Sequence, residues 1–155
     1  MCGIFGTVSK SWAGQAEAAA SVIRHRGPDD YGSYRDGDLF LAHYRLAIQD
    51  LSSAGHQPMQ TADGRYTVLL NGEIYNHYEL RKELPSGIHY RSSCDAETLL
   101  YAFAEWREKA FCKLNGIFTA VLYDAQEKEL FLVRDPFGVK PCYYLQADEG
   151  FAFAS

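Results

Sequence analysis

The chain begins Met1-Cys2-Gly3-Ile4-Phe5-Gly6, and these six residues predict both a buried first strand and a nucleophile. Cys2 follows the initiator methionine, and its side chain is small enough for Met1 to be trimmed. Trimming would place a thiol and a free α-amine on one residue. The thiolate is the nucleophilic form of cysteine. An α-amine ordinarily has a pKa of about 7.7–8.0, so it can act as the general base for its own side chain. A cysteine at this position can also be an accident, and the rest of the chain has to decide.

Composition indicates one globular domain over residues 1–155, a length sufficient to bury a full core. Hydrophobic residues make up 47% and charged residues 23%, which is typical of soluble proteins. The net charge of −5 and the lack of a Lys/Arg run argue against a nucleic-acid partner. No apolar stretch approaches the roughly 20 residues that span a membrane, and the first residues do not resemble a signal peptide. We therefore expect no membrane partner.

The cysteines stand apart from one another, at Cys2, Cys94, Cys112 and Cys142. They form no CxxC pair, and the histidines lack the i, i+4 spacing of a helical metal site, so no metal site is expected. Scattered free thiols are typical of a reducing compartment and predict a cytoplasmic protein. The three later cysteines are expected to be buried packing residues.

Apolar and β-branched runs predict strands over residues 3–8, 38–43, 66–70, 117–123, 130–133, 142–145 and 151–153. An Ala-rich stretch predicts a modest helix over 13–24. A second, short helix is expected to be capped by Asn76 and to stop at Pro85, and a longer helix covers about 95–110. Asp63-Gly64 indicates a hairpin turn. Because the strands cluster in hairpins, the pattern predicts an α+β fold with antiparallel sheets.

Polar stretches lie at strand ends or in loops, where functional sites are built on a rigid scaffold. They are MCGIFG (1–6), RHRGPDD (24–30), HYRLAIQDLSSAGHQPM (43–59), NGEIYNHYELR (71–81), SCDAETLL (93–100), LNGIFTAVLYD (114–124) and RDPFGVKPCYYL (134–145). Over essentially the whole chain, this ordered set closely resembles the N-terminal glutaminase domain of class II glutamine amidotransferases. Within that class, the motifs RHRGPDD and NGEIYN resemble those of the glutamine-hydrolysing asparagine synthetase branch.

The resemblance implies a fold, an activity and a set of partners. The fold would be the N-terminal nucleophile hydrolase αββα sandwich, with two antiparallel sheets flanked by helices. Cys2 would attack the side-chain amide of glutamine, form a thioester and release ammonia, and water would then release glutamate. In full-length relatives the ammonia reaches a C-terminal synthetase domain that uses ATP and Mg, whereas this domain needs no cofactor. Expected partners are glutamine, the synthetase domain or subunit, and a second copy of the chain as a homodimer.

The attacked carbonyl develops an oxyanion, which needs fixed hydrogen-bond donors. Asn71 and Gly72 offer a side-chain amide and a backbone N–H, and the resemblance assigns both to the oxyanion hole. Asn-Gly is also the usual sequence of a type I′ turn. However, Glu73 and a helix follow here instead of a returning strand.

A free amino acid also presents an α-carboxylate and an α-ammonium group. The planar fork of Arg45 suits the carboxylate, with a surface role as the alternative. Asp95, with Glu73 as a helper, suits the ammonium group, and Asp95 can at the same time be a helix N-cap. The resemblance assigns Arg45 to glutamine binding and lines the pocket with backbone of the segment that follows it: Leu46, Ala47, Ile48 and Gln49.

Three further residues of the motifs receive supporting roles. Arg26 is expected to support the Cys2 end of the chain. His25 is an alternative base for Cys2, and it ranks below the α-amine because the family needs no histidine. Lys140 is expected to be structural. Two other functions stay open from the sequence, an N-terminal nucleophile amidase for another acyl substrate and a non-catalytic regulatory module.

Overall fold

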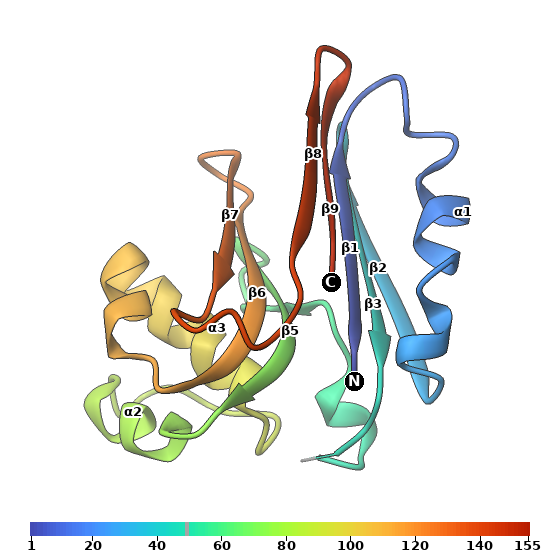
Figure 1. Cartoon of the computed structure of the whole chain (residues 1–155). Helices are drawn as coiled ribbons and strands as arrows, with labels where there is room; N and C mark the ends of the chain where they lie inside the picture. The colour runs from blue at the N-terminus through green and yellow to red at the C-terminus, as the bar shows by residue number, and fades with distance from the viewer. Residues whose placement is uncertain (49) are drawn as a thin grey trace.

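The computed structural model describes residues 1–48 and 50–155, and it contains two antiparallel sheets that lie face to face (Figure 1). Sheet A has the strand order β2 (Asp30–Asp36), β3 (Leu39–Arg45), β1 (Gly3–Val8), β9 (Gly150–Ala154) and β8 (Tyr143–Ala147). Sheet B has the order β4 (Met59–Gln60), β5 (Tyr66–Ile74), β6 (Gly116–Asp124) and β7 (Glu129–Arg134). Helix α1 (Ala16–Ser21) lies outside sheet A, whereas α2 (His77–Glu83) and α3 (Asp95–Trp106) lie outside sheet B (Figure 1). The predicted αββα sandwich is confirmed.

Strand β3 shows how the sequence builds the layers around sheet A. Side chains alternate between the two faces of a strand. Leu39 and Leu41 accordingly pack into the core between the two sheets. Phe40 and Ala42 point the other way and pack under α1. Because both faces are covered, the strand reads as an almost continuous apolar run.

Strand β5 is the corresponding central element of sheet B. Leu69 packs into the core between the sheets. Val68, Leu70 and Ile74 pack on the opposite face, in the core beneath α3. The same alternation turns Asn71 toward sheet A, where its side chain contacts Ser155.

The helices predicted over residues 13–24 and about 95–110 are both shorter in the structure. The Ala-rich helix covers only Ala16–Ser21, and a separate 3-10 turn follows at Arg24–Arg26. Gly14 has low helix propensity, and it precedes the observed start. Helix α3 ends at Trp106 because Arg107 adopts a φ of 53°, and a 3-10 segment, Arg107–Lys113, replaces its last turn.

Strands β2 and β4 were not predicted from the sequence. β2 is an edge strand in which polar residues alternate, so its apolar signal is weak. β4 has two residues, too few for a recognisable pattern. The Asp63-Gly64 turn between β4 and β5 is confirmed, with Gly64 at a φ of 72°.

Asn76 occupies the N-cap position of α2, as predicted, but its side chain does not cap the helix. Its Nδ2 instead donates to the Lys113 carbonyl at 2.8 Å, and its Oδ1 accepts from Asn115 N–H at 2.9 Å. Asn76 therefore links the start of α2 to the approach to β6.

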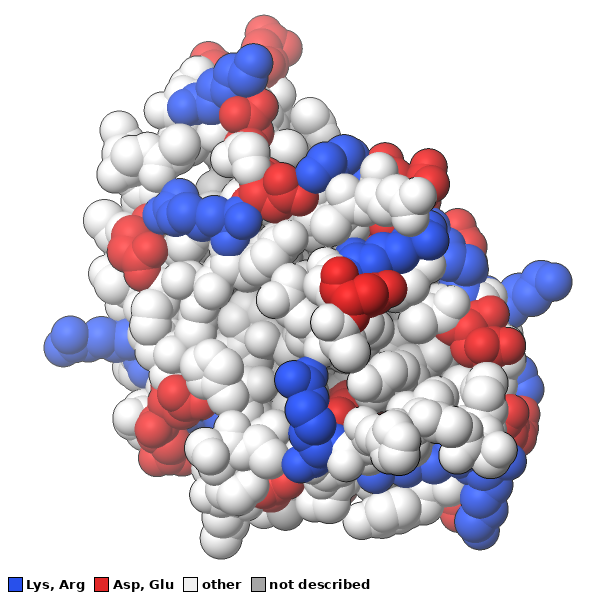
Figure 2. Space-filling view, turned by 180° about the vertical axis from the view of Figure 1, so that it is seen from behind, with Lys and Arg blue, Asp and Glu red and all other residues white. Residues whose placement is uncertain are grey.

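Charges of both signs are interspersed on the surface. Figure 2 shows Lys and Arg beside Asp and Glu over one face of the molecule, without a large area of one sign. Among the described residues, no helix has the length and apolar character needed to cross a membrane.

Candidate active site

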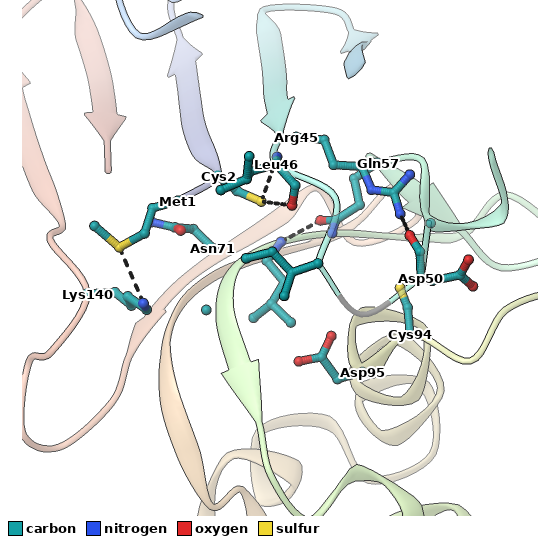
Figure 3. Close-up of a pocket in the computed structure, with 14 residues that line it drawn as sticks. Met1, Cys2, Arg45, Leu46, Asp50, Gln57, Asn71, Cys94, Asp95 and Lys140 are labelled. Carbon is teal, nitrogen blue, oxygen red and sulfur yellow. Dashed lines mark hydrogen bonds between the residues drawn. The ribbon is translucent and has the colours of Figure 1, made fainter. Parts of the chain in front are cut away.

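A pocket of about 90 Å³ opens at the N-terminal end of β1, between the two sheets (Figure 3). Seven residues that the sequence analysis assigned to the site line it: Cys2, Arg45, Leu46, Ile48, Asn71, Gly72 and Asp95. Seven residues that it did not assign complete the lining: Met1, Asp50, Gly55, Gln57, Leu70, Cys94 and Lys140. Segments distant in the chain therefore converge on one cavity.

Cys2 precedes β1, which is the central strand of sheet A and is paired on both sides. Its Sγ accepts from Leu46 N–H at 3.4 Å and lies 3.6 Å from the Leu46 carbonyl, to which the thiol can donate. Arg26 Nε donates to the Cys2 carbonyl at 3.2 Å, a contact consistent with the supporting role predicted for Arg26. Backbone and side-chain contacts thus hold the thiol at the pocket.

Met1 lies at the mouth of the same pocket. Its Sδ is 3.3 Å from Lys140 Nζ, and its side chain is exposed (Figure 3). With Met1 in place, the nitrogen of Cys2 is part of a peptide bond and has no basic lone pair. Removal of Met1 would both create the α-amine and widen the pocket.

The backbone of Gly72 points into the pocket. Gly72 pairs with Phe118 on β6. Phe118 gives its N–H to Asp135 Oδ2 at 3.1 Å, and its carbonyl accepts from Asp135 N–H at 2.9 Å. Both polar groups of Phe118 therefore face β7, so its pair with Gly72 is the non-hydrogen-bonded kind. It follows that the N–H and carbonyl of Gly72 point away from β6, to the open side of β5.

The neighbours of Gly72 on β5 support this direction. Leu70 N–H donates to Gln57 Oε1 at 2.6 Å, and Ile74 N–H donates to Asp95 Oδ2 at 2.8 Å. Both bonds lie on the edge of β5 away from β6. Gly72 stands midway between them, so its N–H is directed to the cavity that it lines.

Gly72 is also required by its backbone conformation. Its φ of +151° is one that L side chains rarely adopt. A Cβ at this position would collide with the Ile117 carbonyl and the Phe118 backbone on β6. The Asn71-Gly72 pair is thus part of a continuous strand and not a type I′ turn.

The side chain of Asn71 is buried between the sheets, beside Met1 and Cys2 (Figure 3). Its Nδ2 donates to Ser155 Oγ at 3.1 Å. The same hydroxyl accepts from Ile4 N–H at 3.0 Å, and Ser155 N–H donates to the Ile4 carbonyl at 2.9 Å. One of the two amide hydrogens of Asn71 is used in this way, and the other has no acceptor in the part of the chain that the structure describes. Ser155 was missed by the sequence analysis, because a small residue after a strand carries no local signal.

Arg45 ends β3 and is 8% exposed, so a plain surface role is excluded. Its Nη1 donates to the Ser52 carbonyl at 2.9 Å, and its Nη2 donates to the Asp50 carbonyl. A guanidinium group has five N–H donors, and the described residues accept from two of them. Gly55 makes room for the guanidinium, since a Cβ there would collide with it.

Asp95 is the first residue of α3, and Cys94 is the N-cap, so the expected N-cap assignment is wrong by one residue. Its Oδ1 accepts from Ala96 N–H at 2.9 Å, and its Oδ2 accepts from Ile74 N–H at 2.8 Å. Burial raises the pKa of the Asp95 carboxyl to about 6, although the two backbone donors act in the opposite direction. The carboxylate is therefore a desolvated acceptor, which favours a cationic ligand.

Three assigned residues do not join this lining. Ala47 donates its N–H to Asp29 Oδ2 at 2.8 Å. Glu73 lines a neighbouring cavity together with Ser93. Gln49 lies outside the residues that the structure describes.

The other titratable residues considered from the sequence have other surroundings. His25 is exposed, its Nδ1 lies 3.1 Å from the Val22 carbonyl, and it lines a different cavity. Cys112 is exposed, so the packing role predicted for it is wrong. Cys94 is buried as predicted but contributes to the pocket wall. Within residues 1–48 and 50–155, His, Cys, Asp and Glu side chains form no group of three that could hold a metal ion.

Asp50 is another residue that the sequence analysis missed. Its Oδ1 accepts from the N–H of Ser52 at 2.9 Å and from its hydroxyl at 2.6 Å. Its Oδ2 accepts from Ser93 N–H at 3.3 Å. These bonds lower the pKa of Asp50, with the Ser52 hydroxyl as the largest cause. Asp50 therefore ties the Arg45 loop to the loop before Asp95.

Comparison with known proteins identifies the family. A model of the glutamine amidotransferase domain matches residues 1–155. Asparagine synthetase [glutamine-hydrolyzing] 1 of Bacillus subtilis strain 168 is 36% identical over 163 aligned residues, which cover 100% of this chain and 26% of that protein. Asparagine synthetase [glutamine-hydrolyzing] 2 of Lotus japonicus is 40% identical over 148 residues, which cover 92% of this chain and 25% of that protein.

A solved structure shows the same fold. It is glutamine phosphoribosylpyrophosphate amidotransferase from B. subtilis, complexed with ADP and GMP, which superposes with a TM-score of 0.83 over 99% of this chain and 41% of that one. The sequence identity is 18%, so this likeness concerns the fold. The resemblance inferred from the seven motifs is confirmed: the chain belongs to the glutamine amidotransferase domain family, and its curated relatives are glutamine-hydrolysing asparagine synthetases.

Proposed function

We propose that this chain is the glutaminase part of an asparagine-synthetase-like enzyme and that it hydrolyses glutamine to glutamate and ammonia. The observation that carries the proposal is the convergence, in one pocket, of the Cys2 thiol, the inward-facing Gly72 N–H, and two groups of opposite charge, Arg45 and Asp95. Together these groups match the amide, the carboxylate and the ammonium group of one amino acid.

In the proposed reaction, removal of Met1 frees the α-amine of Cys2, and this amine takes the proton of the thiol. The thiolate then attacks the side-chain carbonyl of glutamine. Gly72 N–H and the Asn71 amide donate to the oxyanion that develops. The C–N bond of the substrate amide then breaks. The protonated α-amine of Cys2 returns its proton to the leaving nitrogen, and ammonia departs. Water attacks the remaining thioester, and glutamate is released with a free thiol.

The same proposal orients the other end of the substrate. Arg45 has three N–H donors with no acceptor among the described residues and would bind the α-carboxylate. Asp95 would accept from the α-ammonium group, and Glu73, which lies near enough to raise the pKa of Asp95, adds negative charge beside it. Backbone of the segment from Leu46 to Gln49 completes the proposed pocket.

The ammonia would be used by a second domain. The chain spans about a quarter of the length of the curated relatives that it matches. We propose that the parent protein carries an ATP- and Mg-dependent synthetase domain C-terminal to this one and amidates aspartate to asparagine. A homodimer and a cytoplasmic location stay predictions.

The experiment that tests the proposal is intact-protein mass measurement before and after treatment with the glutamine analogue 6-diazo-5-oxo-norleucine, followed by peptide mapping. We expect a protein without Met1 that gains one adduct on Cys2. Cys2→Ala, with its N-terminus processed in the same way, should form no adduct and release no ammonia from glutamine. Glutaminase activity that survives Cys2→Ala would overturn the proposal.

Arg45 distinguishes glutamine from another acyl substrate. Arg45→Met keeps much of the apolar bulk but loses every donor, so it should raise the KM for glutamine by about tenfold or more if the α-carboxylate is bound. An unchanged KM would favour an amidase for a substrate without that carboxylate. A protein that keeps Met1 when purified would favour a non-catalytic module.

A further inference from the structure

The peptide groups just before the proposed oxyanion donors are held by two buried side chains. Gln57 Oε1 accepts from Leu70 N–H at 2.6 Å. His43 Nε2 lies 3.2 Å from the Leu70 carbonyl. Gln57 is 7% exposed and His43 is completely buried. Both the N–H and the carbonyl of Leu70 are therefore hydrogen-bonded to buried side chains.

These side chains stand where a neighbouring strand would otherwise be. β4 pairs with β5 only at Met59 and Gln60, opposite Val68 and Thr67. Beyond that point the edge of β5 has no pairing strand among the described residues. Leu70 is the next residue whose polar groups face this edge, and without side-chain partners they would be buried and unsatisfied.

The chemical form of His43 follows from its contact. A carbonyl oxygen can only accept, so the Nε2 of His43 carries a hydrogen and donates to Leu70. Its Nδ1 is buried without a partner among the described residues. Complete burial lowers the pKa of His43 to about 4, so the ring is neutral near pH 7. His43 is thus a fixed neutral donor, and it comes from sheet A, the sheet that also carries Cys2.

We infer that Gln57 and His43 are positioning residues, which hold the Leu70 peptide and thereby place the Asn71 amide and Gly72 N–H where the oxyanion forms. His43 sets the distance between β5 and the sheet of the nucleophile. Gln57 sets the rotation of the strand about its own axis. The inference rests on the proposed glutaminase function and adds residues that never touch the reacting atoms.

The test uses Gln57→Leu in the protein without Met1. Leucine is close in size but cannot accept from Leu70 N–H. The matched control is Gln60→Leu on the adjacent strand, which removes an Nε2 bond to Thr67 Oγ1 of 3.2 Å outside the pocket. We expect Gln57→Leu to lower kcat for glutamine by about tenfold or more, with KM within about twofold, since the donors act mainly in the transition state. Gln60→Leu should match the wild type.

A second readout separates donor alignment from damage to the nucleophile. Iodoacetamide alkylates the Cys2 thiolate at a saturated carbon, a reaction that develops no oxyanion. Its rate on Cys2 should therefore be unchanged in Gln57→Leu. Loss of alkylation together with kcat, a raised KM with unchanged kcat, or a wild-type kcat would each overturn the inference.

His43 provides an independent pair of variants should Gln57→Leu fail to fold. His43→Gln can place an amide N–H near the position of Nε2, whereas His43→Leu cannot. We expect His43→Gln to keep most of the kcat that His43→Leu loses, and equal losses in two folded variants would overturn the inference. If the wild-type protein neither hydrolyses glutamine nor takes the diazo-oxo-norleucine label, the proposed function itself fails, which is a different result from an active wild type matched by its variants.

Discussion

Asp95 combines two tasks that single residues usually do separately. Its two oxygens hold the first turn of α3 and the end of β5 through backbone N–H groups. Burial at the same time raises the pKa of this carboxyl to about 6. The energetic cost of ionising Asp95 can be recovered when a cation binds to it. The proposed substrate carries such a cation.

This pKa predicts how glutamine binding depends on pH. Only the ionised form of Asp95 attracts the α-ammonium group, so affinity should be nearly complete at about pH 7 and should fall as pH decreases through about 6. At pH 5 about one site in ten is ionised, and the KM for glutamine should be about tenfold higher than at pH 7. Steady-state kinetics between pH 5 and 8 would measure this.

Asp95→Asn serves as the control for that prediction. The variant should have a high KM at every pH, because an amide cannot ionise. A wild-type KM that stays flat from pH 7 to pH 5 would show that Asp95 does not bind the ammonium group.

At the scale of elements, β5 determines most of the geometry of the site. One face of the strand packs under α3, and the other packs against sheet A. On the edge of β5 away from β6, the N–H groups of Leu70 and Ile74 donate to side chains. Gly72 lies between these two residues, and its N–H faces the pocket. The strand therefore supplies core packing and an exposed donor within nine residues.

Gly72→Ala should disturb this strand. The new Cβ would collide with the Ile117 carbonyl, and the φ of +151° is strained for alanine. We expect a loss of about 1–3 kcal/mol in the free energy of unfolding and a lower kcat for glutamine. Urea denaturation and glutaminase kinetics would measure the two effects.

Gly14→Ala is the matched control for that variant. A Cβ at Gly14 meets no atom within 4 Å, and the residue lies in a turn before α1. Its stability and kinetics should stay close to those of the wild type. Equal stability of Gly72→Ala and the wild type would show that β5 can shift to accept a side chain.

At the scale of the whole molecule, the site depends on how the two sheets lie against each other. Sheet A carries Cys2 and Arg45, and sheet B carries Asn71 and Gly72. The apolar core between them fixes their separation, and the His43 and Ser155 hydrogen bonds cross the same space. Packing between the sheets therefore sets the geometry of the proposed site as well as contributing to stability.

Leu69→Ala tests this dependence. Leu69 is fully buried between the sheets, so truncation should cost about 2–5 kcal/mol in the free energy of unfolding. We also expect reduced glutaminase activity in the fraction that remains folded. Leu51→Ala is the control, since Leu51 is 79% exposed and its truncation should change stability by less than about 0.5 kcal/mol.

Strand and helix patterns predicted an α+β fold with antiparallel sheets, because strand alternation and apolar helix faces are local patterns. The αββα layering was implied by the family resemblance. It was less successful at helix ends, where Arg107 adopts a positive φ that no pattern announces. The polar edge strand β2 was missed because only apolar runs were taken as strands. Most of the proposed site could be assigned because Cys2, Arg45, Asn71, Gly72 and Asp95 stand in recognisable motifs.

Residue types and their spacing along the chain were enough to indicate a candidate nucleophile, the order of the motifs and the family. The tertiary structure decided which groups face the pocket. The direction of Gly72 N–H depends on pairing with Phe118, and Ser155 reaches Asn71 across 84 residues of chain. Such contacts arise only when the sheets pack, because a residue's neighbours across the fold are not encoded in its immediate sequence.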